Sequence, residues 1–345
     1  MFEPTSGEYD SYAVSVNSAI EANSLPKTSG RVRIYYIRIP SQLPEPDLHA
    51  IRRSRLGPLD LIKVTALMDI TRGRREVTIG LLDGPVALDH ASLIRTSIRQ
   101  LATNGSSTCS EPSTAACSHG TFVAGILSAR RDSDTPGICP DCTLLVRPIF
   151  HEKALGLEAV PSITPLELAA AIIDSVEAGA QILNISSVMR QLSTRSDRDL
   201  EASLDYAARH GVIVIVAAGN QGMIGSTPLT RHPWVIPVVG YELSGRPMDQ
   251  TNLGHSLGRR GIGAPGQVTS INIEGQQPLV QWGTSFAAPL VTGTIALLWS
   301  LFPTATATEV KLAVGSQHAR PATLAPPLLD AWAAYERLST ALTRR

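Results

Sequence analysis

The chain has no excess of charge of either sign, because 30 lysines and arginines are balanced by 30 aspartates and glutamates. It also lacks a long run of basic residues. Proteins that bind nucleic acid or an anionic membrane surface usually carry a basic stripe or patch. The sequence therefore predicts neither nucleic acid nor a membrane as a partner.

An uninterrupted apolar run long enough to cross a membrane, about 20 residues, is missing as well. The longest apolar stretch, Phe286 to Phe302, contains Pro289, Gly293 and several hydroxyl side chains, so we expect a buried helix there. The first twenty residues carry acids and polar groups and do not show the basic start and apolar core of a secretory signal. These features favour a cytoplasmic location.

Hydrophobic residues make up 43% of the chain and charged residues only 17%, which is ample for a sizeable core. For 345 residues, one globular domain with a modest extension is the expected organisation. Residues 1–57 are predicted to be a partly disordered N-terminal extension, with one candidate strand where polar and apolar residues alternate at 32–36. Residues 58–345 are predicted to form the main domain, and no repeat of fixed period is evident.

Short apolar strands alternate with amphipathic helices through the main domain. After a lead-in helix within 58–75, the pattern predicts strands at 77–82, 143–148, 181–186, 212–217 and 235–239, and helices at 119–129, 165–179 and 197–210. Continuous apolar strands of this kind are typical of a parallel sheet buried on both faces. The predicted fold class is therefore α/β, with a mostly parallel central sheet between layers of helices. Such sheets place their functional groups at the carboxyl ends of the strands.

Four segments supply the groups that a serine nucleophile requires. Ser285 follows a glycine turn in Gly-Thr-Ser-Phe-Ala-Ala-Pro and precedes the apolar helix. A serine hydroxyl needs a base to take its proton and a third group to orient that base. His119 is the candidate base, and Asp83, at the end of the first apolar strand, is the candidate orienting carboxylate. Asn220, just after the strand at 212–217, is the candidate oxyanion donor, together with the Ser285 backbone N–H.

Each of these residues alone also has a structural interpretation. Asp83 and Asn220 stand in turn-forming sequences, and His119 and Ser285 stand where a residue often caps a helix. Their joint occurrence in the order Asp, His, Ser, which is one of the known orders of a catalytic triad, favours catalysis.

The four motifs resemble those of the subtilisin-like serine proteases, the subtilases. His-Gly-Thr-Phe-Val-Ala-Gly (119–125) fits the family's histidine motif, and Gly-Thr-Ser-Phe-Ala-Ala-Pro (283–289) fits its serine motif. Ala-Ala-Gly-Asn (217–220) fits the oxyanion segment, and Gly263–Gly266 is similar to the loop that precedes the serine. The resemblance covers residues 70–335 and implies a three-layer subtilisin-like fold and a serine endopeptidase that forms an acyl-enzyme.

Two further segments resemble one branch of that family. Asp83-Gly84-Pro85-Val86 replaces the usual Asp-Thr-Gly or Asp-Ser-Gly, and Arg147-Pro148-Ile149-Phe150 follows downstream. Both are similar to the branch associated with cyanobactin-type peptide maturation. This resemblance implies a peptide or protein substrate, such as a ribosomally made precursor with its leader peptide.

Three other functions remain as alternatives. They are a general degradative subtilase, a transpeptidase or macrocyclase, and a non-catalytic binding module of subtilase shape. The interval between Asn184 and Asn220 has little room for the substrate-capping insertion typical of macrocyclising relatives, which favours hydrolysis. All three triad residues are present, which disfavours the binding module.

An extended substrate is expected to lie between two short segments that pair with its main chain. The expected substrate-binding residues are Ser186, Ser187 and Val188 on one side and Ala217, Ala218 and Gly219 on the other. The resemblance implies a glycine where this chain has Val188, so a branched side chain should narrow the cleft there.

Four cysteines, Cys109, Cys117, Cys139 and Cys142, flank the predicted histidine helix. Cys139 and Cys142 have the C-x-x-C spacing that offers two thiolates to a metal, so all four could form a tetrahedral zinc site. A disulfide, with Cys109 and Cys117 suited by their spacing, and free thiols are the alternatives. The predicted chemistry needs no cofactor. Calcium is common in the resembling family, but the sequence shows no dense run of oxygen ligands.

Overall fold

The computed structural model describes residues 57–94, 96–101, 109, 114–150, 163–186, 197–273, 277–315 and 323–344. Residues 1–56, which include nearly all of the predicted N-terminal extension and its candidate strand, lie outside the described residues.

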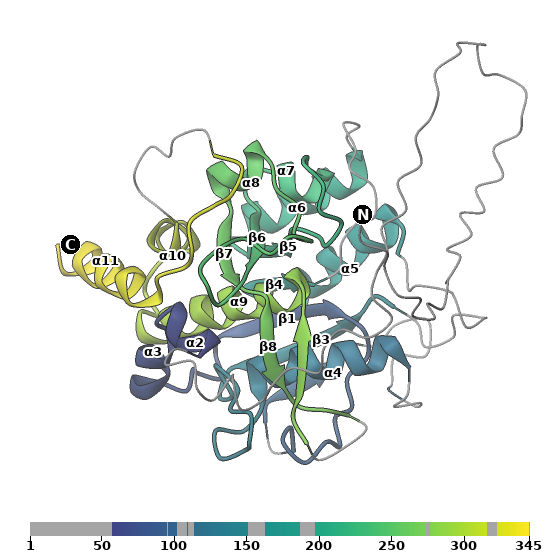
Figure 1. Cartoon of the computed structure of the whole chain (residues 1–345), viewed down its shortest axis with the longest axis vertical. Helices are drawn as coiled ribbons and strands as arrows, with labels where there is room; N and C mark the ends of the chain where they lie inside the picture. The colour runs from purple at the N-terminus through teal and green to yellow at the C-terminus, as the bar shows by residue number, and fades with distance from the viewer. Residues whose placement is uncertain are drawn as a thin grey trace, which may run out of the picture. The chain divides into compact units, whose positions relative to one another are not determined.

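A sheet of seven strands in the order β2-β3-β1-β4-β5-β6-β7 forms the centre of the fold (Figure 1). All neighbouring strands in this sheet are parallel. The strands are β1 Thr78–Asp83, β2 Ile98–Gln100, β3 Thr143–Pro148, β4 Ile182–Ile185, β5 Ile213–Ala217, β6 Ile236–Tyr241 and β7 Ile262–Pro265. Two more strands, β8 Gln267–Ser270 and β9 Leu279–Trp282, pair as an antiparallel hairpin.

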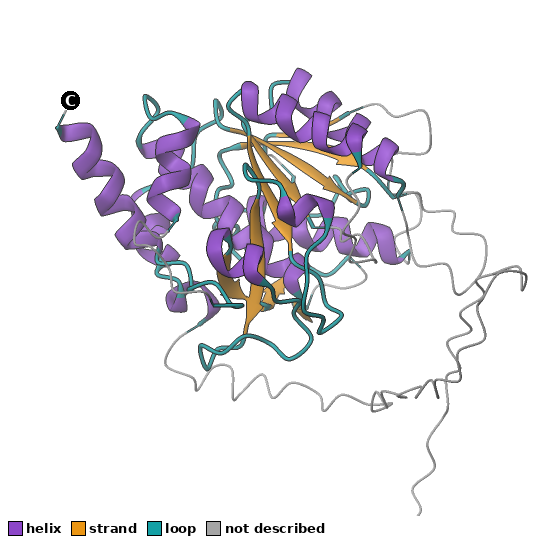
Figure 2. Ribbon diagram, turned by 90° about the horizontal axis from the view of Figure 1, so that it is seen from above, coloured by secondary structure: helices purple, strands orange, loops and turns teal. Residues whose placement is uncertain are grey.

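Helices cover both faces of the sheet (Figure 2). They are α2 Pro58–Leu61, α3 Val64–Ile70, α4 Ala115–Ser128, α5 Pro165–Glu177, α6 Arg198–Arg209, α7 Pro228–Arg231, α8 His255–Arg260, α9 Thr284–Leu301, α10 Ala307–Val314 and α11 Ala331–Thr343. Successive side chains of a strand point to opposite faces of its sheet. Accordingly, Leu81 packs in the cluster that contains α4 and α9, whereas Leu82 packs in the cluster that contains α5 and α6. The predicted three-layer α/β class is therefore confirmed.

Two predicted helices differ from those observed. The lead-in helix expected within 58–75 is divided into α2 and α3, because Lys63 adopts a left-handed backbone conformation with φ 57°. The histidine helix begins at Ala115 rather than at His119, because the Thr114 side chain caps it by accepting a hydrogen bond from Cys117 N. His119 consequently lies in the second turn of α4 and not at its start.

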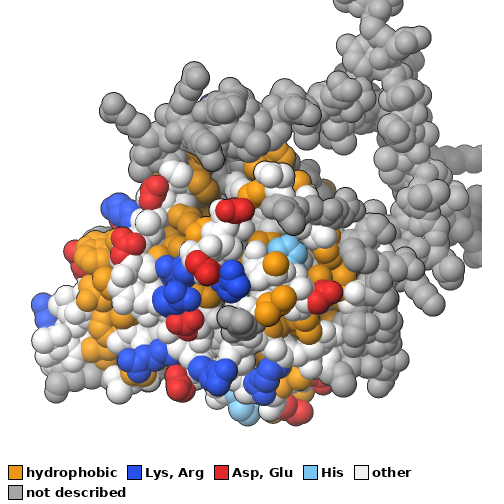
Figure 3. Space-filling view, turned by 90° about the horizontal axis from the view of Figure 1, so that it is seen from below, with side chains coloured by type: hydrophobic (Ala, Val, Ile, Leu, Met, Phe, Trp, Pro, Cys, Tyr) orange, Lys and Arg blue, Asp and Glu red, His pale blue; other side chains and the backbone are white. Residues whose placement is uncertain are grey.

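The apolar stretch after Ser285 forms α9, which is the core helix of the fold. By length and composition it could span a membrane, but 89% of its apolar window is buried inside the protein. At the surface, the face shown in Figure 3 mixes basic, acidic and apolar side chains, in line with the equal numbers of positive and negative residues.

Candidate active site

Asp83 and His119 are joined directly. His119 Nδ1 lies 2.6 Å from Asp83 Oδ1, which also accepts a hydrogen bond of 2.7 Å from Gly84 N. The Asp83 side chain is fully buried, and the His119 side chain is 30% exposed. Because the carboxylate accepts at Nδ1, that nitrogen carries the proton and Nε2 is left to accept another. The pair thus has the form of a base with its orienting carboxylate.

Two opposing effects act on the pKa of His119. Burial lowers this pKa, but the charge of Asp83 and the hydrogen bond to it raise it. The net result is a pKa above the ordinary value for histidine. The imidazolium that would form during proton transfer is therefore stabilised by Asp83.

The close approach of α4 to the end of β1 brings this pair together. A Cβ atom at Gly84 would overlap the Ala116 carbonyl, and a Cβ atom at Gly120 would overlap the Gly84 carbonyl. The strand end and the first turns of the helix therefore meet backbone to backbone. This contact accounts for a glycine after Asp83, at the position where the sequence departs from the usual aspartate motif.

Asn220 and the start of α9 are fixed to one another. Asn220 Oδ1 accepts a hydrogen bond of 2.9 Å from Thr284 N, and Thr284 Oγ1 accepts one of 3.1 Å from Gly219 N. Gly283, with φ 145°, makes the turn that leads into the helix, and Ser285 is the second residue of the helix. Because the amide oxygen of Asn220 is occupied, its Nδ2 group is the one left to donate to a substrate.

His119 also lies beside the start of α9. Its ring centroid is 5.2 Å from that of Phe286, the residue directly after Ser285. Asp83 ends β1, and Asn220 follows the end of β5. All four predicted catalytic residues are therefore gathered at the edge of the sheet where the parallel strands have their carboxyl ends.

The two segments predicted to bind substrate follow neighbouring strands, β4 and β5. Ser186 Oγ accepts a hydrogen bond of 2.7 Å from Asn184 Nδ2, and Asn184 Oδ1 accepts one of 2.8 Å from Thr292 Oγ1. This chain of bonds ties Ser186 to α9. Ala217, Ala218 and Gly219 directly precede Asn220, whereas Ser187 and Val188 lie outside the described residues.

Asn252 is a further residue of the site, which the sequence analysis missed. It is buried, and its Oδ1 accepts hydrogen bonds from Gln221 N at 3.2 Å and Met223 N at 3.0 Å. Its Nδ2 donates to Ala218 O at 3.1 Å and to Gln221 Oε1 at 2.7 Å. Asn252 thus holds both sides of the turn that carries Asn220. No spacing in the sequence signals this role, because the residue is distant from every motif.

The structure divides the four cysteines into two pairs. Cys109 and Cys117 form a disulfide with their Cα atoms 5.5 Å apart, and Cys139 and Cys142 are free and buried. Within the described part of the chain, no three histidine, cysteine, aspartate or glutamate residues are grouped so that they could hold a metal ion. Of the alternatives that the sequence left open for the four cysteines, the structure has the disulfide between Cys109 and Cys117, which leaves two free thiols rather than four.

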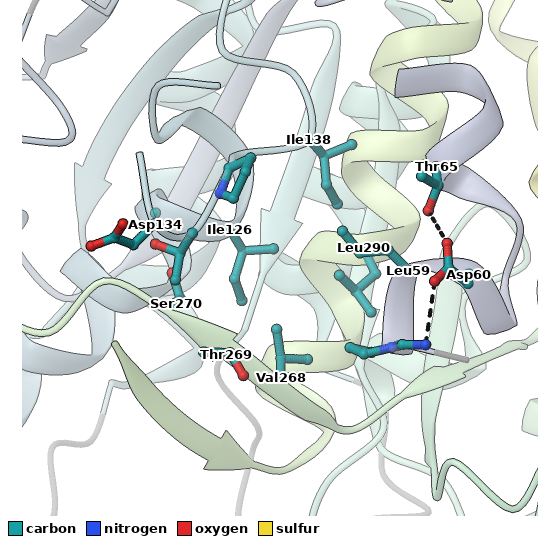
Figure 4. Close-up of a pocket in the computed structure, with 15 residues that line it drawn as sticks. Leu59, Asp60, Thr65, Ile126, Asp134, Ile138, Val268, Thr269, Ser270 and Leu290 are labelled. Carbon is teal, nitrogen blue, oxygen red and sulfur yellow. Dashed lines mark hydrogen bonds between the residues drawn. The ribbon is translucent and has the colours of Figure 1, made fainter. Parts of the chain in front are cut away.

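A separate, largely apolar pocket of about 370 Å³ lies behind the histidine helix (Figure 4). Ile126 of α4, Leu290 of α9 and Val268 of β8 contribute to its wall, and the carboxylates of Asp60 and Asp134 lie on opposite sides of it. The pocket borders the two helices that carry His119 and Ser285, but neither of these residues lines it.

Comparison with known proteins agrees with this geometry. The profile of the subtilase family, Peptidase S8, matches residues 74–322. Mycosin-4 of Mycobacterium tuberculosis is 29% identical over 251 residues, which is 60% of this chain and 53% of mycosin-4. The chain thus spans about half the length of that relative.

Two solved structures are similar over almost their whole length. A mutant of the protease domain of PatA has a TM-score of 0.70 and 28% identity. The match covers 78% of this chain and 97% of the chain of that protease domain. The prenylagaramide maturation protease PagA has a TM-score of 0.69 and 28% identity, with 80% and 98% covered. The chain belongs to the subtilase family, Peptidase S8.

Proposed function

We propose that this protein is an endopeptidase that cleaves ribosomally made precursor peptides through an acyl-enzyme. The observation that carries the catalytic part is the 2.6 Å contact between His119 Nδ1 and Asp83 Oδ1 beside the start of α9. The substrate class is supported by the likeness to PatA and PagA, of which PagA is described as a maturation protease.

In the proposed mechanism, His119 Nε2 takes the proton of the Ser285 hydroxyl as its oxygen attacks the scissile carbonyl. Asp83 holds the imidazole in the required tautomer and stabilises its charged form. Asn220 Nδ2 and the Ser285 backbone N–H donate to the oxyanion. His119 then gives its proton to the leaving amine. A water molecule, deprotonated by the same imidazole, releases the acyl group and restores the serine.

Main-chain pairing should hold the peptide. The substrate would lie extended between the segment that begins at Ser186 and the segment Ala217–Gly219, because both follow the ends of neighbouring strands. The bonds from Asn184 to Ser186 and from Asn252 to Ala218 keep these two edges in position.

Labelling with a fluorophosphonate probe tests the nucleophile. We expect one label per wild-type chain at Ser285 and none on the Ser285→Ala variant, whose circular dichroism should match that of the wild type. A labelled Ser285→Ala variant would refute the assignment.

Mass spectrometry of incubated precursor peptides tests the reaction. Hydrolysis gives two linear products whose masses sum to that of the substrate plus one water. A product that lacks this water, with closed ends, would instead show a macrocyclase. Products cut at many unrelated bonds would favour a general degradative protease.

A further inference from the structure

The amino ends of β6 and β7 border a second pocket, of about 280 Å³, which includes Ile236 and Ile262 at these strand starts. The proposed catalytic residues follow the opposite, carboxyl ends of the parallel strands. Because β6 is six residues long, the two edges of the sheet are about 20 Å apart. A ligand in this pocket would therefore be bound at a distance from the site of cleavage.

Lys311 of α10 reaches into the same pocket from one side. Its Nζ donates hydrogen bonds to Pro233 O at 3.1 Å and Trp234 O at 2.5 Å, and it lies 4.4 Å from the centroid of the Trp234 ring. Two of the three ammonium donors are thus used within the protein, and one is left for a ligand.

Arg259 and Arg260, at the end of α8, line the pocket from the other side. Arg260 Nη2 donates to Thr230 O at 3.1 Å, which fixes its guanidinium. The Arg259 side chain is exposed and makes no hydrogen bond or ion pair with any other residue that the structure describes. Its five donors are therefore directed only to solvent or to a ligand.

These three cations have no counter-charge in the pocket, since its described lining contains no aspartate or glutamate. In agreement, burial and the neighbouring charge of Arg260 lower the pKa of Lys311 to about 8. Buried or half-buried charges are normally paired, and arginine forks suit carboxylates well. The pocket is thus electrostatically suited to an anionic group.

The rest of the lining is mostly apolar and includes the half-buried Trp234 and Leu312, which is 56% exposed. A bare inorganic anion would leave this surface unused, whereas a peptide can offer a carboxylate and an apolar side chain together. We propose that the pocket binds an acidic segment of the peptide substrate, with a carboxylate on Arg259 and Arg260 and an adjacent apolar side chain on Trp234. This inference rests on the proposed function for the peptide nature of the ligand.

Fluorescence anisotropy with the full-length Ser285→Ala variant tests the proposal. The probe is an acetylated, amidated peptide of alternating glutamate and leucine with a neutral fluorophore, and its counterpart has glutamine for glutamate. We expect the acidic peptide to bind at least about tenfold more tightly than the glutamine peptide, as one charge-assisted hydrogen bond would provide. Arg259→Ala should weaken binding by about the same factor. Arg99→Ala, an exposed arginine on the distant edge strand β2, is the matched control and should change nothing.

Equal binding of the two peptides, or equal effects of Arg259→Ala and Arg99→Ala, would overturn the proposal. Displacement of the acidic peptide by inorganic phosphate, together with acetate that binds as tightly as this peptide, would also overturn the proposal. Such a result would mean that the leucines add nothing and that the pocket is a simple anion site. Wild-type protein labelled at Ser285 by a fluorophosphonate should still bind the acidic peptide, and loss of binding would place the peptide in the cleft instead. A chain that binds the peptide but does not react with the fluorophosphonate would refute the proposed function and leave the pocket's ligand chemistry supported.

Discussion

The Asn220 side chain accepts a hydrogen bond from Thr284 N through its Oδ1 atom, at 2.9 Å. The bond orients the amide, because only the oxygen can accept from a backbone N–H. It joins Asn220, three residues after the end of β5, to the residue before Ser285. A preorganised donor of this kind is effective in catalysis because it needs no reorganisation when charge develops.

Replacement of Asn220 should therefore reduce turnover far more than substrate binding. We expect Asn220→Ala to lower kcat by about 10²- to 10³-fold with a small change in KM. The measurement is steady-state kinetics on a cleavable peptide, with the exposed Gln277→Ala variant as a control for folding and handling. A kcat within a factor of about three of wild type would exclude Asn220 as an oxyanion donor.

The bond between Asp83 and His119 should govern the pH dependence of activity. His119 must be neutral to act as a base, so activity falls as the pH drops through its pKa, which Asp83 raises. The Asp83→Asn substitution removes the charge that raises the pKa of His119 and leaves the burial that lowers it. The acidic limb of the kcat/KM profile should then move to lower pH, while kcat falls by about 10⁴-fold. An acidic limb at unchanged or higher pH in this variant would show that Asp83 does not control the titration.

A side chain at Gly84 should separate the helix from the strand. The Gly84→Ala substitution pushes a methyl group into the Ala116 carbonyl, so we expect a loss of about 1–3 kcal/mol of stability, typical of overpacking. Activity should fall as well, because α4 carries His119. Thermal denaturation and kinetics measure both effects. Gly57→Ala, whose added Cβ would lie 3.4 Å from a flexible carboxylate, is the control and should be nearly neutral.

Most of the central sheet could be predicted from the sequence, because its strands are apolar on both faces and stand between amphipathic helices. The strand predicted at 143–148 coincides with β3. The strands β2 and β7 to β9 were missed, since segments of three or four residues are too short to carry a clear period. The start of α4 was misplaced because a threonine cap, and not hydrophobic periodicity, determines it.

The catalytic candidates could be named from motifs, but the residues that hold them in position could not. Asn252 is polar and buried, and its bonds to residues around Asn220 arise only when the chain folds. The state of the cysteines was likewise undetermined, because spacing alone permits a metal site or a disulfide. The distance between Cys109 and Cys117 decides between them, and this distance is a tertiary property.

Asn252 should act through Asn220, which can be measured by a double-mutant cycle. Asn252→Ala leaves Gln221 N and Met223 N without their acceptor, so the turn should loosen and kcat should fall by about tenfold or more. If this loss arises from a misplaced oxyanion donor, the substitution should cost little once Asn220 is already alanine. Additive losses in the double variant would mean that Asn252 affects catalysis by another route.

The disulfide between Cys109 and Cys117 should stabilise the approach to the histidine helix. It closes a short loop, with a sequence separation of 8, so its loss should cost about 2.5 kcal/mol on the chain-entropy estimate. For a domain of this size, Tm should fall by roughly 4 °C. A reductant should produce this fall in Tm in the wild type and in the Cys142→Ser variant. This variant lacks one of the two free buried thiols but keeps the disulfide between Cys109 and Cys117. In Cys109→Ser, whose Tm should already be low, the same reductant should have no effect. A wild-type Tm that does not respond to complete reduction, verified by thiol titration, would show that the bond contributes nothing to stability, because Cys117 would then be held by helix packing alone.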